Sequence, residues 1–385
     1  MSPQLSVTSS DELNVLVDSE QFVIQGNQVW TGLEVINAAF FFSSIPADSL
    51  ISDNWHYNLG QVLTEGFDID GVGSRSSINN NHAIHSGFEY KNTSGTGYVT
   101  ARDVTFSGNS SYESVNPASA AFTFTSSGSF RDNTAYNPQG WGFFCSNLDA
   151  SDLPNNGNGS ITGGGNKVIY AGNAGFVGAL RIGSDPLGKA VGNINFDPFD
   201  CYIDPKYEAD NPNTKVPNGA TNGIIEMRGD PSNVRIANGK VLPCTGNQIV
   251  ARPDTTMDNI IFENMEHGDT DDSCYDFGAT MTRVRIINPR LPANIGDRPF
   301  RMGTVSKSSI VCEEHPNLQN AATSNAGTGF LINGLGFESG LGATNPPTAT
   351  GDIWALGVTV QNTDDGSMWI RVNHSTTPTT AWKQI

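Results

Sequence analysis

Residues 104–109 read Val-Thr-Phe-Ser-Gly-Asn, a short alternation of apolar and polar residues that closes on glycine and asparagine. Related segments follow at residues 129–133 and 160–166. Apolar residues at every second position share one face of a β-strand, and asparagine suits the following turn because it tolerates left-handed backbone angles. A strand and turn repeated in this way are typical of a β-solenoid, whose coils must stack to bury their apolar faces.

The repeats are spaced by 24 to 34 residues. Tyr112 and Tyr136 are 24 residues apart, and Tyr136 and Tyr170 are 34 apart, with a polar insertion around residues 153–158 between them. Further along the chain, three segments of the form apolar-x-apolar-x-Asn lie 26 and 24 residues apart and end at Asn238, Asn264 and Asn288. Related segments at such regular intervals favour internal repetition over chance.

These repeats predict an all-β protein, and specifically a right-handed parallel β-helix (solenoid) with a small C-terminal β-rich cap. In such a fold the turn asparagines can stack in a ladder from coil to coil. One apolar residue of each segment should point inward, namely Val104, Ile161, Val234, Ile260 and Val284. Little helix is expected, with one short candidate at residues 11–17. The alternative fold is an ordinary antiparallel sandwich of similar strands.

The distribution of the repeats divides the chain into three regions. Residues 1–60 are rich in aromatic residues without a clear repeat, and we interpret them as an N-terminal capping or attachment region. Residues 61–300 contain the repeats and are predicted to form the β-helix. Residues 301–385 are predicted to form the C-terminal cap, because the period fades there and strong strand-like alternation returns near the end. The expected strands of this cap lie at residues 351–354, 357–360, 368–372 and 381–385.

Charge and cysteine content argue against several classes of binding partner and several kinds of site. The formal net charge of −18 argues against nucleic acid, whose affinity for proteins comes from Lys and Arg on phosphates, and against anionic membrane surfaces. No apolar run approaches the ~18 residues that suggest a transmembrane helix, so no membrane insertion is expected. The five cysteines include no Cys-x-x-Cys pair, which favours buried thiols over zinc or redox sites. No metal or cofactor is predicted.

The last part of the chain contains Gly351-Asp-Ile-Trp354, then Asp365-Gly-Ser-Met-Trp-Ile-Arg-Val372, and ends on Ala381-Trp-Lys-Gln-Ile385. This stretch resembles the β-rich endings of tail-fibre and other appendage proteins of tailed bacteriophages. The Gly-, Asn- and Ser-rich repeats before it are similar to phage tailspikes, commonly trimers of right-handed parallel β-helices that bind surface polysaccharide. The resemblance implies a homotrimer of the virion that binds a host cell-surface glycan, with residues 1–60 contacting other virion proteins.

The densest acidic cluster contains Glu263, His267, Asp271 and Asp272. Carboxylates on adjacent coils can stand ~5 to 9 Å apart, as glycoside hydrolysis requires, with one acting as acid and the other as base or nucleophile. β-Helical glycosidases of the polygalacturonase class pair such acids with a Gly-His-Gly element, and none follows Asp271 and Asp272 here. The cluster is therefore interpreted as a solvated turn, and these four residues are catalytic candidates only if the protein is an enzyme.

Aromatic residues near the polar insertion are the stronger functional candidates. Flat rings beside amide and carboxylate groups suit carbohydrate, because sugars present both C–H faces and hydroxyl edges. Trp141, Tyr136 and Tyr170 are therefore predicted to bind glycan, the alternative being that they are inward core residues. Two other functions remain open on the same scaffold. One is a polysaccharide lyase or glycoside hydrolase, and the other is a non-catalytic structural virion component such as a decoration or spacer.

Overall fold

The described part of the computed structural model comprises residues 4–6, 22–32, 38–61, 65–91, 93–94, 97–98, 103–115, 120–125, 127–145, 160–183, 190–217, 222–297, 299–302, 305–306, 309–311, 331–332, 335–338, 357–362, 366–373 and 381–385. The expected helix at residues 11–17, the insertion at 153–158 and the expected strand at 351–354 lie outside these residues. Cys312 also lies outside them.

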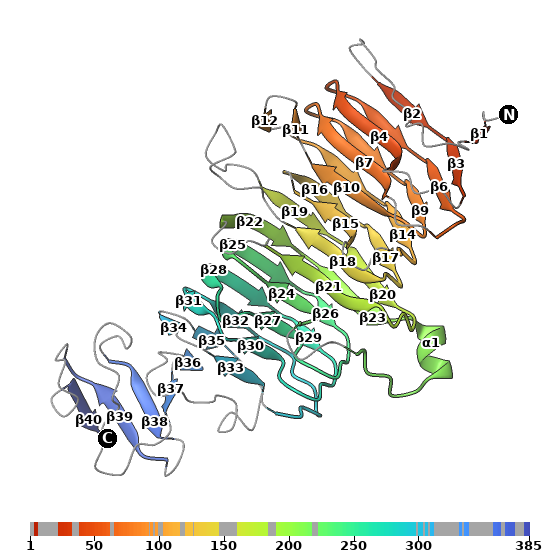
Figure 1. Ribbon diagram of the computed structural model, residues 1–385. Coiled ribbons are helices and arrows are strands. Elements are labelled where there is room, and N and C mark those ends of the chain that lie inside the picture. Colours follow the sequence, from red (N-terminus) through yellow and green to blue (C-terminus); the bar gives the residue numbers. More distant parts are fainter. Residues whose placement is uncertain are drawn as a thin grey trace.

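Nearly all of the described strands belong to three stacked sheets, here named A, B and C (Figure 1). Sheet A contains β1 (Gln4–Ser6), β3 (Gln28–Thr31), β6 (Trp55–Asn58), β9 (His82–Ile84), β14 (Ser110–Tyr112), β17 (Thr134–Tyr136), β20 (Asn166–Tyr170), β23 (Phe199–Ile203), β26 (Lys240–Val241) and β29 (Glu266–His267). Sheet C contains β4 (Ala38–Ile45), β7 (Glu65–Val72), β10 (Gly87–Lys91), β15 (Ala120–Phe124), β18 (Gly140–Cys145), β21 (Phe176–Ile182), β24 (Ile225–Met227), β27 (Ile249–Ala251), β30 (Tyr275–Phe277) and β33 (Phe300–Met302).

Sheet B holds the first strand of each coil, so that the chain visits sheets B, A and C in turn. It contains β2 (Val23–Gln25), β5 (Leu50–Ser52), β8 (Ser77–Asn79), β13 (Thr105–Ser107), β16 (Gly128–Arg131), β19 (Ile161–Gly164), β22 (Ala190–Phe196), β25 (Asp230–Ala237), β28 (Thr256–Glu263), β31 (Thr280–Thr282), β32 (Arg285–Ile287), β34 (Val305–Ser306), β35 (Ser309–Val311) and β36 (Leu331–Ile332). Outside the three stacks lie the antiparallel pair β11 (Thr93–Ser94) and β12 (Gly97–Tyr98), and the helix α1 (Pro205–Asp210).

Strands within each stack pair in parallel. In sheet B, for example, Phe106 of β13 lies between Ile78 of β8 and Phe130 of β16. Every pairing between the described strands of residues 104–290 is parallel, which contradicts the antiparallel sandwich and confirms the all-β prediction. Stacked parallel strands of this kind fit a β-helix. Strands β2 to β6, inside residues 1–60, pair in the same three sheets.

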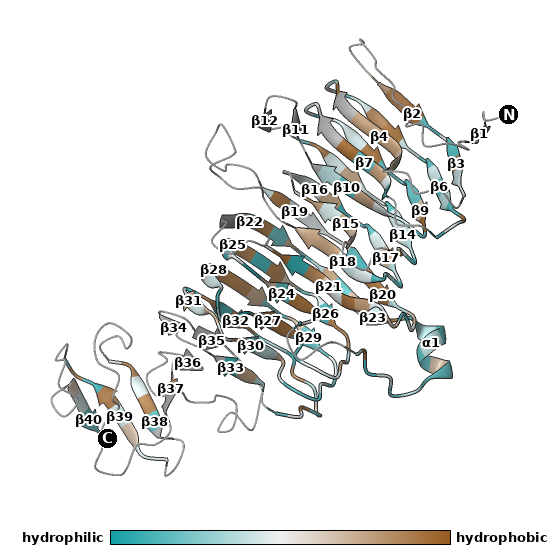
Figure 2. Ribbon diagram, viewed as in Figure 1, coloured by the Kyte–Doolittle hydropathy of each residue, from teal (hydrophilic) through white to brown (hydrophobic). Residues whose placement is uncertain are grey.

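The interior of the stack is apolar, as the repeats predict. Val104, Ile161, Val234, Ile260 and Val284 are all at most 2% exposed, which confirms their inward direction. Figure 2 shows hydrophobic residues in strands along the whole length of the stack.

A column of phenylalanines in sheet C forms the most regular part of the core. Phe40, Phe67, Phe88, Phe122 and Phe143 occupy consecutive strands and are almost fully buried. Neighbouring ring centroids are 4.6, 4.7, 4.9 and 4.9 Å apart, with interplanar angles of 10° or less. Burial of a large ring at each step gives every coil a strong apolar contact with the next.

Asparagines at the B-to-A turn form the predicted ladder. The amide of Asn81 donates to Oδ1 of Asn109 at 3.0 Å, and Asn109 and Asn133 repeat this contact with the next coil at 3.1 and 2.9 Å. All three side chains are fully buried. Each amide also donates to a main-chain carbonyl of a neighbouring coil, so that the buried N–H groups are satisfied. A second, exposed asparagine contact joins Asn264 to Asn238 at 2.9 Å, and both have positive φ angles, as the turn prediction requires.

The C-terminal strands change to antiparallel pairing. Strand β37 (Leu335–Glu338) pairs with β38 (Thr359–Asn362) in parallel, whereas β38, β39 (Met368–Arg371) and β40 (Trp382–Gln384) form antiparallel pairs. A separate apolar cluster holds them together, consisting of Val360, Trp369, Ala381 and Trp382. Figure 1 shows this group at the end of the stack opposite to β1.

Two further expectations concern membrane-spanning helices and the cysteines. Among the described residues, no helix is long and apolar enough to span a membrane. Cys145, Cys201, Cys244 and Cys274 are buried free thiols, in agreement with the interpretation of the cysteines. Burial raises the pKa of each of the thiols of Cys145, Cys201 and Cys274 well above its ordinary value, which makes them poor nucleophiles.

Candidate functional surfaces

The three predicted glycan-binding residues do not form one surface. Tyr136 lies on the outward side of β17 in sheet A and is half-buried. Trp141 belongs to sheet C and is only 7% exposed. Tyr170 is 4% exposed and packs edge-on against Phe176 in the core, with a ring distance of 5.3 Å. Trp141 and Tyr170 therefore do not offer an open ring to a ligand in this chain.

A slip of the repeat by one residue explains Tyr170. Tyr136 is opposite Tyr112 on one side, but on the other side it is opposite Ile169 rather than Tyr170. Because side chains alternate across a strand, this slip moves Tyr170 to the inner face while Ile169 takes the outer position. The sequence spacing aligned the tyrosines correctly in two coils and wrongly in the third.

Tyr136 belongs to a column on the outer face of sheet A that sequence reasoning did not assemble. The strand register places one half-buried side chain of each coil in line, and the members are Trp30, Tyr57, Ile84, Tyr112, Tyr136, Ile169 and Tyr202. We call this the outer aromatic column. Trp30 and Tyr57 lie parallel at 5.4 Å, and Tyr112 and Tyr136 are 6.0 Å apart. In four of these coils the signal in the sequence is an aromatic residue two positions after the strand begins, at Trp30, Tyr57, Tyr112 and Tyr136.

Polar groups lie beside Tyr136 and Tyr202 of the outer aromatic column. The Tyr136 hydroxyl donates to Oδ2 of Asp204 at 3.4 Å. Partial burial and the nearby Asp204 carboxylate raise the pKa of Tyr136, so this phenol stays protonated and remains a donor. Burial also raises the pKa of Tyr202, with further contributions from Asp200 and Asp204. Rings beside phenol, carboxylate and amide groups are the combination that carbohydrate recognition uses.

The four conditional catalytic residues have different surroundings. Glu263 ends β28 in sheet B and pairs with Arg235 at 2.8 Å. Asp271 pairs with Lys215, and Asp272 lies 3.6 Å from Arg301. His267 is buried in β29 of sheet A, and burial lowers its pKa to about 3.

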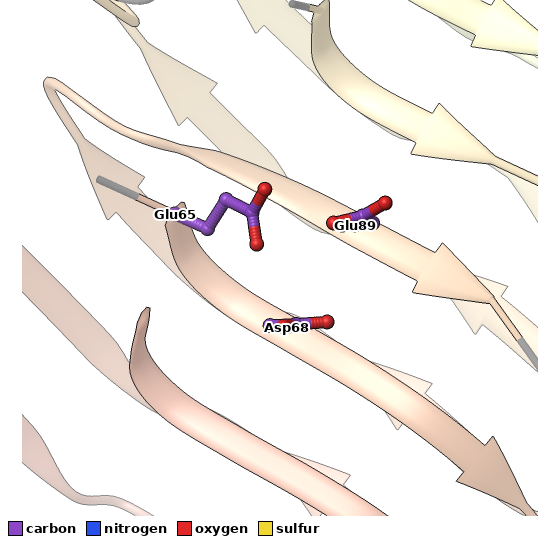
Figure 3. Close-up of side chains that lie close together, drawn as sticks. All are labelled: Glu65, Asp68 and Glu89. Carbon is purple, nitrogen blue, oxygen red and sulfur yellow. The ribbon is translucent and has the colours of Figure 1, made fainter. Parts of the chain in front are cut away.

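A different carboxylate group lies on sheet C, where no catalytic residue was predicted. Glu65 and Asp68 of β7 and Glu89 of β10 have carboxylate oxygens that all lie within 4.8 Å of one another (Figure 3). Asp68 and Glu89 are directly opposite in the parallel register, and Asp68 follows Phe67, a core residue, so that its side chain points outward. A recurring Gly-Phe-acid segment, at residues 66–68 and 87–89, is the sequence signal that could have found this pair.

The carboxylate group of sheet C could do either of two kinds of chemistry. Neighbouring carboxyl groups can share the roles of acid and nucleophile in glycoside hydrolysis. Carboxylate oxygens are also the ligands that divalent cations such as Ca²⁺ prefer. No family model, curated protein or solved structure matches the chain, so these surfaces are interpreted from its own residues.

Proposed function

We propose that the protein is a virion appendage, of the tail-fibre or tailspike kind, that binds a host cell-surface polysaccharide along the outer aromatic column. In this proposal the stacked sheets are a right-handed parallel β-helix that takes in strands β2 to β6 and residues 61–300, and residues 301–385 form a C-terminal cap. Residues 1–60 would contact other virion proteins. The observation that carries the binding function is the outer aromatic column, in which five rings from Trp30 to Tyr202 and two isoleucines lie half-buried on one face.

An extended polymer matches the geometry of this column. Strands of a sheet are ~4.8 Å apart, so the side chains of the column recur at short steps along the stack, with Ile84 and Ile169 between the rings. A polysaccharide lying parallel to the stack would therefore meet the ring pairs Trp30–Tyr57 and Tyr112–Tyr136 in turn. It would also meet the Tyr136 hydroxyl and the Asp204 carboxylate beside it. Many weak contacts along one line give useful affinity without a deep pocket.

We expect the double change Tyr112→Ala and Tyr136→Ala to weaken polysaccharide binding at least about tenfold, because each ring would act as an interface anchor. Affinity electrophoresis on candidate host polysaccharides measures this effect. The matched control is Phe144→Ala, which removes an outward ring from sheet C instead of sheet A. Equal affinity of the double variant and the wild type would refute the role of the column.

The proposed homotrimer has its own test at the C-terminal strands. Val372 and Ile385, next to the Trp369 and Trp382 cluster, are 49% and 66% exposed, an apolar edge that a neighbouring copy could cover. We expect deletion of residues 351–385 to convert the trimer into monomers or aggregates in light scattering. This deletion also removes Trp354, which lies outside the described residues. A truncated protein that keeps the size of the intact oligomer would exclude this role.

Glycoside hydrolysis is the second candidate function, and the carboxylate group of Figure 3 favours it. The binding proposal predicts no new reducing ends, and no unsaturated uronate absorbance from a lyase reaction, when wild-type protein is incubated with the polysaccharide that it binds. If cleavage occurs, Asp68→Asn should lower its rate by ~10² to 10⁴, because a group needed for proton transfer or attack is lost. Asp258→Asn, in a carboxylate of sheet B that is paired with Arg283, is the control. Cleavage abolished by Asp68→Asn alone would replace the binder with a hydrolase.

A further inference from the structure

The group of C-terminal strands contains an arginine in its apolar interior. On β39, Trp369 and Arg371 are buried whereas Met368 and Ile370 are half-buried, so the arginine shares the inner face of the strand with the tryptophan. Arg371 is only 1% exposed and is one of the largest fully buried side chains among the described residues. The strand register sets it opposite Trp382, a member of the separate apolar cluster that holds β38 to β40 together. A guanidinium group therefore lies in surroundings that are otherwise apolar.

Two contacts hold the guanidinium group in place. Its Nε donates to the main-chain oxygen of Asn373 at 3.3 Å, and its central carbon lies 6.0 Å from the centre of the Trp382 ring. Its other two nitrogens, Nη1 and Nη2, are buried, and no described residue accepts a hydrogen bond from either of them. Nε1 of Trp369 is likewise a buried donor for which the described part of the chain provides no acceptor.

Burial of these donors is unfavourable unless an acceptor meets them. A buried polar group without a partner loses the hydrogen bonds that it made to water, and a buried charge loses more than a neutral group does. The ring of Trp382 offsets part of this cost through its negative face, but it neutralises no charge. Among the described residues, no carboxylate pairs with Arg371. An anion is therefore the partner that this interior requires.

The position of the donors defines the shape of that anion. Nη1 and Nη2 form one edge of the planar guanidinium, and the parallel N–H groups of such an edge fit two oxygens of one carboxylate or phosphate group. Trp369, two residues before Arg371 on the same face, offers a third N–H. Because Arg371 is only 1% exposed, the ligand has to be enclosed within the protein, which restricts it to a small molecule or ion.

We propose that the C-terminal strands bind a small oxyanion, a carboxylate or a phosphate, through Nη1 and Nη2 of Arg371 and Nε1 of Trp369. The oxyanion neutralises the buried charge and accepts the hydrogen bonds of the three nitrogens. It binds the closed strands and not the opened ones, so it stabilises β38 to β40 by mass action. This inference is independent of the outer aromatic column, which lies on sheet A.

The test is amide hydrogen exchange of β38 and β39 in the full chain, followed by mass spectrometry. We expect sodium acetate, at about ten times its dissociation constant, to slow the exchange of these strands about tenfold, because only the closed state binds it. Sodium chloride at the same ionic strength should have less than about a twofold effect, since chloride cannot offer two oxygens to the guanidinium edge. The exchange of β28 in sheet B should not respond to either salt.

Arg371→Met tests the site itself, because methionine fills a similar volume without any N–H donor. We expect this variant to lose the response to acetate. Without acetate its strands should exchange more slowly than those of wild type, since an apolar side chain replaces a buried charge that lacks its counterion. Arg283→Met is the matched control, in an exposed arginine of sheet B that is paired with Asp258. Its C-terminal strands should respond to acetate as those of wild type do.

The opposite effects of the variant with and without acetate distinguish an anion site from a purely structural arginine. Equal responses of wild type to acetate and chloride, or a response to acetate that persists in Arg371→Met, would overturn the proposal. If Arg371→Met does not fold in circular dichroism, Arg371→Lys decides, because lysine keeps the charge but lacks the paired donors. An undiminished response to acetate in Arg371→Lys would refute the site. Sodium phosphate in place of acetate identifies the oxyanion, which is the one that slows exchange at the lower concentration.

Discussion

Phe143→Ala is expected to lower the free energy of unfolding by about 3–5 kcal/mol, the cost of truncating a fully buried aromatic side chain. Phe143 is 0% exposed and stacks on Phe122 at 4.9 Å. It also meets Phe199 edge-on at 5.5 Å, so the phenylalanine column is joined to sheet A at this point. The substitution would leave a cavity between two stacked coils, and the close-packed core around it could fill that cavity only in part. Chemical denaturation monitored by circular dichroism measures the loss.

The next residue provides the control for this change. Phe144→Ala removes the same ring from the same strand, but Phe144 points outward and is half-buried, with Arg181 above it. We expect a loss of about 1 kcal/mol, from surface packing and one cation–π contact. Equal losses for the two variants would mean that the inward and outward faces of β18 are assigned wrongly.

The local features of this fold could be predicted from the sequence because they depend on neighbouring residues. The alternation of apolar and polar residues over two or three positions was enough to assign Val104 and Val234 to the interior. The turn asparagines Asn238 and Asn264 follow from backbone preference, and their positive φ angles agree. Recurrence of both patterns was enough to predict stacked strands and an asparagine ladder.

Contacts between coils were harder to predict, because the turns between strands vary in length. The phenylalanine column joins residues 27, 21, 34 and 21 positions apart, and no fixed period connects them. The members of the outer aromatic column were hard to predict for the same reason, because one extra residue places Tyr170 on the inner face and Ile169 on the outer face. The pair Asp68 and Glu89 depends on this register too, which is why the sequence indicated the acidic run at Asp271 and Asp272 instead.

Acidification is expected to destabilise the protein through two buried histidines. Burial lowers the pKa of His56 and of His267 from 6.5 to about 3. Below pH 6.5 the unfolded chain takes up a proton at each of these positions, whereas the folded chain does so only near pH 3. Stability is therefore complete above pH 6.5 and is lost as the pH falls from 6.5 towards 3, with a slope approaching about 1.4 kcal/mol per pH unit for each histidine.

Hydrogen bonds show why the folded protein resists protonation of His267. Gln248 donates its amide to the carbonyl oxygens of Gly268 and Leu242, so its Oε1 is turned towards His267 Nδ1, which donates to it at 2.7 Å. Nε2 is then the acceptor for the Tyr275 hydroxyl at 2.9 Å. A proton on Nε2 would meet a hydroxyl that already donates there, on a ring that is only 5% exposed.

We therefore expect His267→Gln to be less stable than wild type at pH 7.5 but to lose less stability on acidification. Between pH 6.5 and 4, His267→Gln should lose roughly 2 to 3 kcal/mol less of its free energy of unfolding than wild type does. His56→Asn should give a similar and additive change. Urea unfolding at a series of pH values measures it. Carboxylates protonate in the same range, but they do so equally in the wild type and in both variants. Parallel stability curves for all three proteins would show that these histidines are accessible to protons in the folded state.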